Sequence, residues 1–320
     1  MIGAVVIGRN EGERLIRCLA SLDAVDQIVY VDSGSTDGSV GEAEKAGAAV
    51  VILDPDLPFT AARARNAGLE RLRELAPVEL VQFVDGDCEL QPDWIKTAST
   101  FLGENPKVAI ACGRRRERFP QASIYNQLCD LEWDTPIGRA DACGGDALMR
   151  VASLVNVGGY RDDLIAGEEP ELCVRLRAAG WRVWRLDAEM TLHDADMHRF
   201  GQWWRRTARC GHAWAEGAAL HGAPPERHCV PGVRRALIWG LGLPVVTAVL
   251  VLALGPWGLA ALLAYPAQIV RIALREGPGD QFSWSFAGAM VLGKFAELSG
   301  ILRYARRYAG GGRSGIIEYK

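Results

Sequence analysis

Three acidic residues at alternate positions follow an apolar run in the first third of the chain. Asp85, Asp87 and Glu89 stand in the segment DGDCE, directly after LVQFV at 80–84. Side chains two residues apart share a face in extended backbone, so these carboxylates can converge on one point. Carboxylates that close repel each other unless a cation neutralises them, and oxygen ligands suit Mg²⁺ or Mn²⁺ better than zinc. The spacing predicts a divalent-metal site; a solvated acidic turn is the alternative.

Other candidate residues stand where strands or turns are expected to end. Asp32 follows IVYV and begins DSGSTDGS; it can accept hydrogen bonds from a nucleotide base or ribose, or cap the turn. Glu168 and Glu169, in GEEPELC, precede an expected helix, where a carboxylate can act as a general base or stabilise the helix N-terminus. His193, in MTLHDAD, is a candidate metal ligand or proton carrier, or else a polar loop residue.

Arginines gather in two segments. Arg65, in AARARNAG, can reach a phosphate group or face solvent on a helix. Arg114, Arg115 and Arg116 are expected in a loop after a strand at 108–112. They can clamp the pyrophosphate of a lipid-linked acceptor through bidentate hydrogen bonds, or form a solvated basic loop that pairs with anionic lipid headgroups.

The first 195 residues must position these side chains, and their pattern alternates between strands and helices. Strands are expected at 2–7, 27–31, 48–53, 80–84, 108–112, 146–150 and 181–186. Helices are expected at 11–22, 40–46, 60–75, from 92, and at 123–133, 151–157, 170–179 and 199–216. This rhythm predicts an α/β fold with a mostly parallel sheet and helices on both faces. Ligands bind at the carboxyl ends of such strands, where the polar segments at 8–12, 32–39 and 85–89 lie.

Composition excludes several classes of protein. The net charge of −3 combines an acidic N-terminal part with a basic C-terminal part. Residues 1–198 have 21 Lys+Arg against 33 Asp+Glu, and residues 199–320 have 15 against 6. An acidic N-terminal part does not favour nucleic-acid binding, and no GxGxxG follows the first strand as a dehydrogenase would require. The eight cysteines include no CxxC pair, which disfavours a zinc ribbon or a disulfide framework. The opening MIGAVVIGRNEGE has no basic region or cleavage site, so the catalytic part is expected in the cytosol.

One apolar segment departs from this soluble pattern. The 35 residues between Arg235 and Arg271 carry no charge and are interrupted by Gly255-Pro256. A single helix of that length would measure about 53 Å, well beyond a ~30 Å hydrocarbon core. Two helices over 237–254 and 257–272 fit better, and their basic ends would then lie on the cytoplasmic side of a membrane. A buried helical hairpin is the alternative.

Six motifs in order resemble the family 2 glycosyltransferases of the GT-A fold over roughly residues 2–195. They are VVIGRNEGERLIRCLASL, IVYVDSGSTDGS, AARARNAG, VQFVDGDCELQPDW, GGDALMRVASLVNVGGYRD and GEEPELCVRLRAAGW. The resemblance implies a mostly parallel GT-A sheet flanked by helices, a nucleotide-diphosphate sugar donor (UDP- or GDP-linked), and Mg²⁺ or Mn²⁺.

The resemblance also implies roles for individual residues. Nucleotide-sugar contacts fall on Ile7, Arg9, Glu11, Asp32, Arg65, Asp85 and Gly145. Metal ligation falls on Asp85, Asp87, Glu89 and His193. Glu168 and Glu169 stand where the family usually has Glu-Asp, which makes Glu169, or else Glu168, the catalytic base.

The chain is therefore expected to divide into a GT-A catalytic domain at 1–220, a linker at 221–235, a membrane hairpin at 236–275 and a basic amphipathic helix and tail at 276–320. We expect an inverting, metal-dependent transferase at the cytoplasmic side of the inner membrane, acting on a polyprenyl-linked glycan acceptor. Two alternatives are a nucleotidyltransferase, for which GRNEG is a poor phosphate loop, and a non-catalytic membrane scaffold, although every acidic residue needed for chemistry is present.

Overall fold

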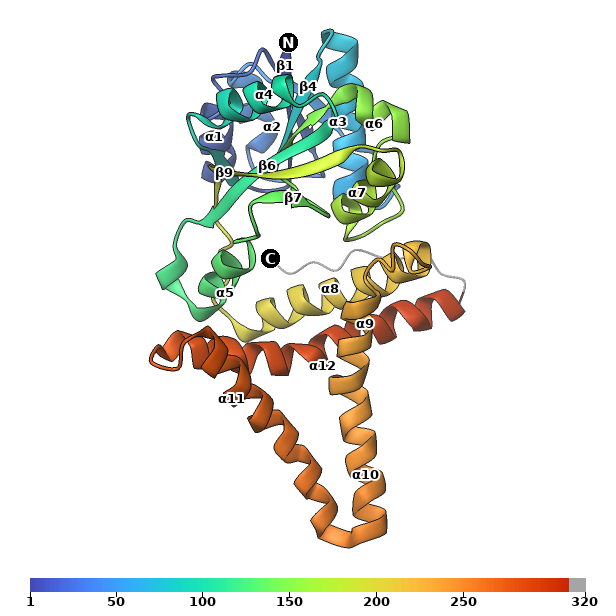
Figure 1. Ribbon diagram of the computed structural model, residues 1–320. Helices are drawn as coiled ribbons and strands as arrows, with labels where there is room; N and C mark the ends of the chain where they lie inside the picture. The colour runs from blue at the N-terminus through green and yellow to red at the C-terminus, as the bar shows by residue number, and fades with distance from the viewer. Residues whose placement is uncertain (311–320) are drawn as a thin grey trace. The chain divides into compact units, whose positions relative to one another are not determined.

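A computed structural model describes residues 1–310, and the chain separates into two compact units (Figure 1). The first unit comprises Met1–Gln121 and Cys129–Asp196. The second comprises Ala122–Leu128 and the chain from Met197 onward. The predicted tail over 311–320 lies outside the described residues.

A single mixed sheet forms the first unit, and in the described residues it has nine strands. They are β1 (Ile2–Gly8), β2 (Gln27–Asp32), β3 (Ala49–Ile52), β4 (Leu80–Asp85), β5 (Cys88–Leu90), β6 (Val108–Glu117), β7 (Gly138–Ala140), β8 (Ala147–Arg150) and β9 (Arg182–His193). The order is β3-β2-β1-β4-β8-β6-β9-β5, with β7 paired to β9. Strands β1 to β4 are parallel neighbours and β8 is antiparallel to both of its neighbours, so the predicted mostly parallel sheet is confirmed.

Helices cover this sheet, and apolar side chains fill the space between them. They are α1 (Glu13–Ala20), α2 (Ser39–Lys45), α3 (Ala61–Leu75), α4 (Trp94–Glu104), α6 (Val151–Val157) and α7 (Glu168–Ala178). The segment between β6 and β7 forms the short η1 (Pro120–Ala122) and α5 (Ile124–Glu132), whose residues are divided between the two units. Ala4, Val5 and Val6 of β1 are fully buried, because a central parallel strand is covered on both faces. Gly68 of α3 lets that helix approach Val5 more closely than any side chain would permit.

The later strands are longer than their apolar patterns indicate. The strand expected at 108–112 continues to Glu117, so the loop predicted for Arg114 to Arg116 is wrong: all three lie in β6. The strand expected at 181–186 continues to His193. Backbone pairing between β6 and β9 extends both strands, whose outer halves are too polar to signal a strand locally.

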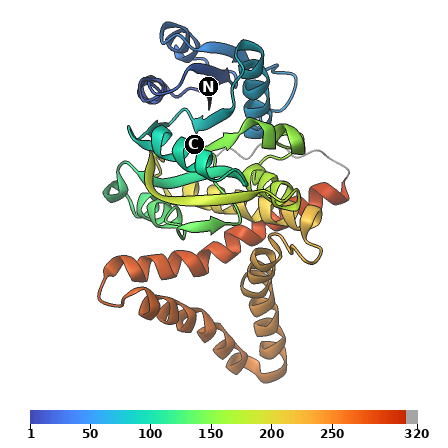
Figure 2. The ribbon, with the colours of Figure 1, turned by 45° about the horizontal axis from the view of Figure 1, so that its top comes forward.

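The second unit is helical. Its helices are α8 (Phe200–His221), α9 (Val230–Leu237), η2 (Ile238–Gly242), α10 (Leu243–Leu254), η3 (Gly255–Leu263), α11 (Ala264–Glu276) and α12 (Gln281–Ala309). Figures 1 and 2 show the two arms of a hairpin joined at the turn after α10. Leu252 and Trp257 near this turn are 88% and 83% exposed. Val230–Glu276 and Gln281–Ala309 are long and apolar enough to cross a membrane, which by itself is weak support for membrane association.

Candidate active site

The carboxyl ends of β1, β2 and β4 meet at one edge of the sheet. Gly8 is paired in register with Asp32, and Ile7 with Asp85. Asp32 is almost fully buried, and its carboxylate accepts hydrogen bonds from the backbone N–H groups of Gly34 and Ser35, both at 2.9 Å. Asp32 therefore caps the turn after β2, one of the two roles expected for it.

The segment after β1 contributes to the same edge. The Ile7 carbonyl accepts a hydrogen bond from Gly86 at 2.8 Å, which joins the β1 end to the turn after β4. The Arg9 guanidinium lies over the Phe59 ring at 5.9 Å from its centroid. Glu11 forms an ion pair with Arg14 at 2.9 Å. Their predicted nucleotide contacts stay predictions.

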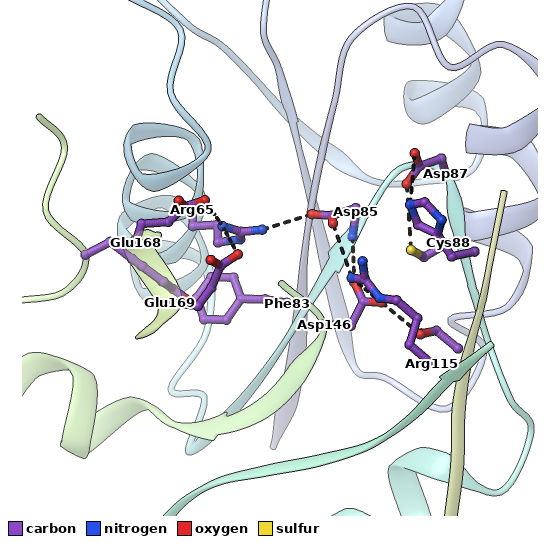
Figure 3. Close-up of polar contacts among 12 residues, drawn as sticks. Arg65, Phe83, Asp85, Asp87, Cys88, Arg115, Asp146, Glu168 and Glu169 are labelled. Carbon is purple, nitrogen blue, oxygen red and sulfur yellow. Dashed lines mark hydrogen bonds and ion pairs between the residues drawn. The ribbon is translucent and has the colours of Figure 1, made fainter. Parts of the chain in front are cut away.

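The Asp85 carboxylate contacts two arginine side chains at this edge (Figure 3). Its Oδ1 lies 3.0 Å from Nη2 of Arg65, and its Oδ2 lies 3.3 Å from Nη2 of Arg115. Arg115 also pairs with the fully buried Asp146 at 2.7 Å. Burial opposes ionisation of Asp85, but the two guanidinium groups outweigh it and hold the pKa of Asp85 below its usual range. Asp85 is thus a fixed, ionised group.

The Arg65 guanidinium connects this edge with the start of α7. Its Nη1 lies 2.9 Å from Oε1 of Glu168 and 2.9 Å from Oε1 of Glu169. The sequence predicted that Glu168 and Glu169 precede the helix. In the structure they are its first two residues, so both stand in the first turn of α7. Glu168 lies 103 residues beyond Arg65 in the sequence, yet the two side chains are in contact. The acidic segment at the end of β4 and the carboxylates at 168–169 therefore belong to one site.

The two glutamates differ in environment. The Glu168 side chain is 5% exposed and accepts a hydrogen bond from Arg65, whereas the Glu169 side chain is 14% exposed. Burial, and then the negative charge of Glu168, raise the pKa of Glu169 from 4.5 to about 7, although Arg65 opposes this shift. A carboxyl group with a pKa near neutrality can accept and release a proton under physiological conditions.

A second cluster lies on the other side of Asp85. Ligand atoms of Asp87, Cys88 and His193 lie within 4.8 Å of one another, as do those of Asp85, Cys88 and Asp146. Burial raises the pKa of the Cys88 thiol well above its usual range, so the sulfur stays protonated and is a poor ligand for a hard cation.

The donor atoms of this second cluster fit a divalent metal. The Nε2 atom of His193 lies 3.5 Å from Oδ2 of Asp87, and carboxylate oxygens beside an imidazole nitrogen suit Mn²⁺. Behind the ring, Nδ1 of His193 is buried without a hydrogen bond and lies 3.8 Å from Oε2 of the buried Glu117. A carboxylate behind a histidine is the usual arrangement for orienting that ring toward a metal.

Glu89 and two of the three clustered arginines lie apart from these groups. Glu89 of β5 pairs with Arg17 at 3.4 Å and closely with Arg118. Arg114 and Arg116 both pair with Asp130, at 3.3 and 3.2 Å, while Arg115 between them contacts Asp85 and Asp146. Consecutive β6 residues face opposite ways, so the three arginines do not form one clamp.

Some residues of the site were not singled out from the sequence. They are Asp146, Cys88, Glu117 and Trp133, whose ring lies 4.8 Å from that of His193 and 5.4 Å from the Arg115 guanidinium. Asp146 occurs in the motif GGDALMR, so its position beside a turn was the available signal. No signal in the sequence pointed to Glu117, because the outer part of β6, in which it lies, is not predicted by the sequence pattern.

The sheet order matches the GT-A-like fold that the sequence predicts. Residues 4–151 match the family described as Glycosyl transferase family 2. The chain is 26% identical over 264 residues to the succinoglycan biosynthesis protein ExoA of Rhizobium meliloti, and the match covers 78% of each chain. These matches confirm the predicted resemblance to glycosyltransferase family 2 and the predicted enzyme class.

Solved structures share the fold. The mannosyltransferase PcManGT from Pyrobaculum calidifontis, in complex with GDP-Man and Mn²⁺, superposes with a TM-score of 0.66 at 19% identity, covering 95% of this chain and 86% of the other. Glucosyl-3-phosphoglycerate synthase from Mycobacterium tuberculosis, with Mn²⁺, UDP-glucose and glycerol 3-phosphate, gives 0.50 at 19% identity over 70% of this chain and 81% of that one. At these identities the likeness concerns the fold.

Proposed function

We propose that this enzyme is an inverting, divalent-metal-dependent glycosyltransferase that moves a sugar from a nucleoside-diphosphate donor to an acceptor hydroxyl. The observation that carries the proposal is the contact path from Asp85 through Arg65 to Glu168 and Glu169. Through these contacts Asp85, the carboxylate on the proposed donor side, and the candidate bases Glu168 and Glu169 lie on two sides of the Arg65 guanidinium. The structural relatives hold GDP-mannose or UDP-glucose with Mn²⁺, which supports donors of this class.

Glu169 is the proposed base. It takes the proton of the acceptor hydroxyl while that oxygen bonds to the anomeric carbon and the bond from this carbon to the diphosphate oxygen breaks. A single displacement inverts the anomeric configuration. The greater exposure of Glu169 and its pKa near 7 favour it over Glu168, which Arg65 holds by a hydrogen bond.

The residues that would hold the ion are Asp87 and His193, with Asp85 beside them. A divalent cation, when bound, stabilises the negative charge that develops on the departing diphosphate. Glu117 lies 3.8 Å behind the His193 ring, where its carboxylate favours a ring that points toward the ion, and Asp146 with Arg115 fixes Asp85. Glu89, held by two arginines, is the weakest of the four predicted ligands.

The acceptor is proposed to be a polyprenyl-linked glycan used in surface polysaccharide assembly, at the cytoplasmic side of the inner membrane. The name of the ExoA relative supports the product class. The exposed apolar hairpin, with arginines at both ends, supports attachment to a membrane with those ends on the cytoplasmic side. Arg114 and Arg116, which both pair with Asp130, remain candidates for acceptor binding, whereas Arg115 contacts Asp85 and Asp146 within the active site.

The test is a donor screen on membranes that contain the full chain. UDP-glucose, GDP-mannose and related donors are supplied with Mn²⁺, with Mg²⁺ or with EDTA, and the release of nucleoside diphosphate and the sugar label in the lipid fraction are measured. We expect metal-dependent release with one donor and none from the Glu169→Gln variant. Release of pyrophosphate from a nucleoside triphosphate would instead indicate a nucleotidyltransferase.

A further inference from the structure

Arg65 is buried between two groups of carboxylates that the sequence separates widely. Its side chain is 3% exposed. One terminal nitrogen contacts Asp85 at 3.0 Å, and the other contacts Glu168 and Glu169, each at 2.9 Å. The guanidinium carbon lies 5.6 Å from the centroid of the Tyr160 ring. The planar group is thus fixed at both ends and on one face.

The carboxylates do not depend on Arg65 equally. Asp85 has a second cation, Arg115, and its backbone N–H donates to Asp146 at 3.1 Å. In the described part of the chain, the ion pairs of Glu168 and Glu169 both go to Arg65. A guanidinium can bridge separate carboxylates in a fixed plane, which a lysine ammonium cannot do. Loss of Arg65 would therefore leave Asp85 in place and release the glutamates.

Gly145 supplies the space for this contact. A Cβ atom on Gly145 would lie 2.5 Å from Nη2 of Arg65 and 2.9 Å from Oδ2 of Asp85. The ion pair joins this Nη2 to Oδ1 of Asp85, which would lie 3.2 Å from the same Cβ, so any side chain there would crowd both atoms of the pair. The neighbouring Gly144 has open space around its Cβ position.

We infer that Arg65 is a positioning residue that holds the Glu168–Glu169 pair against Asp85, and that Gly145 permits this junction by lacking a side chain. The inference changes the role expected for both residues, for which the family resemblance implied nucleotide-sugar contact. It rests on the proposed function, in which one of these glutamates is the base. Displacement of a base by about 1 Å can cost roughly 100-fold in rate.

The decisive pair of variants is Gly145→Ala and Gly144→Ala in the full-length enzyme. The assay is the release of nucleoside diphosphate from UDP-glucose or GDP-mannose, whichever the wild type uses, with Mn²⁺. Gly145→Ala should lower kcat by about tenfold to 100-fold and change the donor KM by less than about threefold. Gly144→Ala should retain wild-type values. A Gly145→Ala enzyme with unchanged kcat, or with only a raised KM, overturns the inference.

Arg65 itself provides the second measurement. Arg65→Gln should lose at least about 100-fold in kcat, and Arg65→Lys should recover only part of it, because one ammonium cannot bridge both sides. Arg71→Gln removes a charge from the exposed part of the same helix, where Arg71 pairs with Glu74, and should have no effect. If Arg65→Gln does not fold, the kcat values of Arg65→Lys and Gly145→Ala still test whether Arg65 positions the glutamates. A wild type that releases no nucleoside diphosphate refutes the proposed function; an active wild type with active Arg65 variants refutes only this inference.

Discussion

The pH dependence of turnover follows from the environment of Glu169. Its pKa is raised to about 7 by burial and by the charge of Glu168, and Arg65 opposes the shift. A base must be ionised to accept a proton, so kcat should rise with pH through this value. A group with a pKa near 7 is about one-tenth ionised at pH 6 and about nine-tenths at pH 8, which predicts a roughly tenfold rise between them.

The assay is kcat from pH 5.5 to 8.5 with saturating donor and Mn²⁺. Glu168→Gln removes the neighbouring negative charge, so in any active variant the rise should move to lower pH. Glu169→Gln should reduce kcat by about 10²-fold or more and abolish the pH dependence. A flat wild-type profile, or a Glu169→Gln enzyme with wild-type kcat, would refute the assignment.

Thermal unfolding gives the same reasoning a second check. The folded pKa of Glu169 lies above the ordinary value of 4.5, so its proton stabilises the fold below pH 4.5 and this contribution is lost as pH rises toward 7. The Glu169→Gln variant has no titrating group at this position, so it should not lose this stability as pH rises. The Tm difference between variant and wild type should therefore favour the variant more at pH 8 than at pH 5.

Three further outcomes are expected. Asp87→Asn should weaken Mn²⁺ binding by about 10-fold or more, measured by electron paramagnetic resonance without substrate, whereas Cys88→Ser should change it little because the thiol is protonated. Gly68→Ala should destabilise the first unit by about 1–3 kcal/mol in urea unfolding, because its Cβ would clash with Val5; an unchanged midpoint would contradict the packing described. Leu252→Glu in the hairpin should reduce flotation with phospholipid vesicles without lowering Tm, and full flotation would count against membrane insertion.

The three consecutive arginines of β6 show a case in which the local sequence pattern does not predict side-chain contacts. RRRER carries the same charge at each arginine, and nothing in it distinguishes Arg115 from Arg114 and Arg116. The pairing of β6 with β9 turns Arg115 toward Asp85 and the other two toward Asp130. The direction of these side chains depends on β9, whose paired residues lie 75 to 76 positions further along the sequence, which is why the predicted loop was wrong.

The amino-acid sequence alone determined the alternation of strands and helices, the carboxyl-end position of Asp32 and Asp85, and the uncharged hairpin segment, because each is encoded by periodicity or composition within one continuous stretch of the chain. Only the tertiary structure decided that Glu168 and Glu169 lie on one arginine with Asp85, that Glu117 stands behind His193, and that Gly145 must be without a side chain. These contacts join segments that come together only when the sheet forms. Burial in that sheet then sets the pKa values, so the chemistry of the site follows from long-range packing.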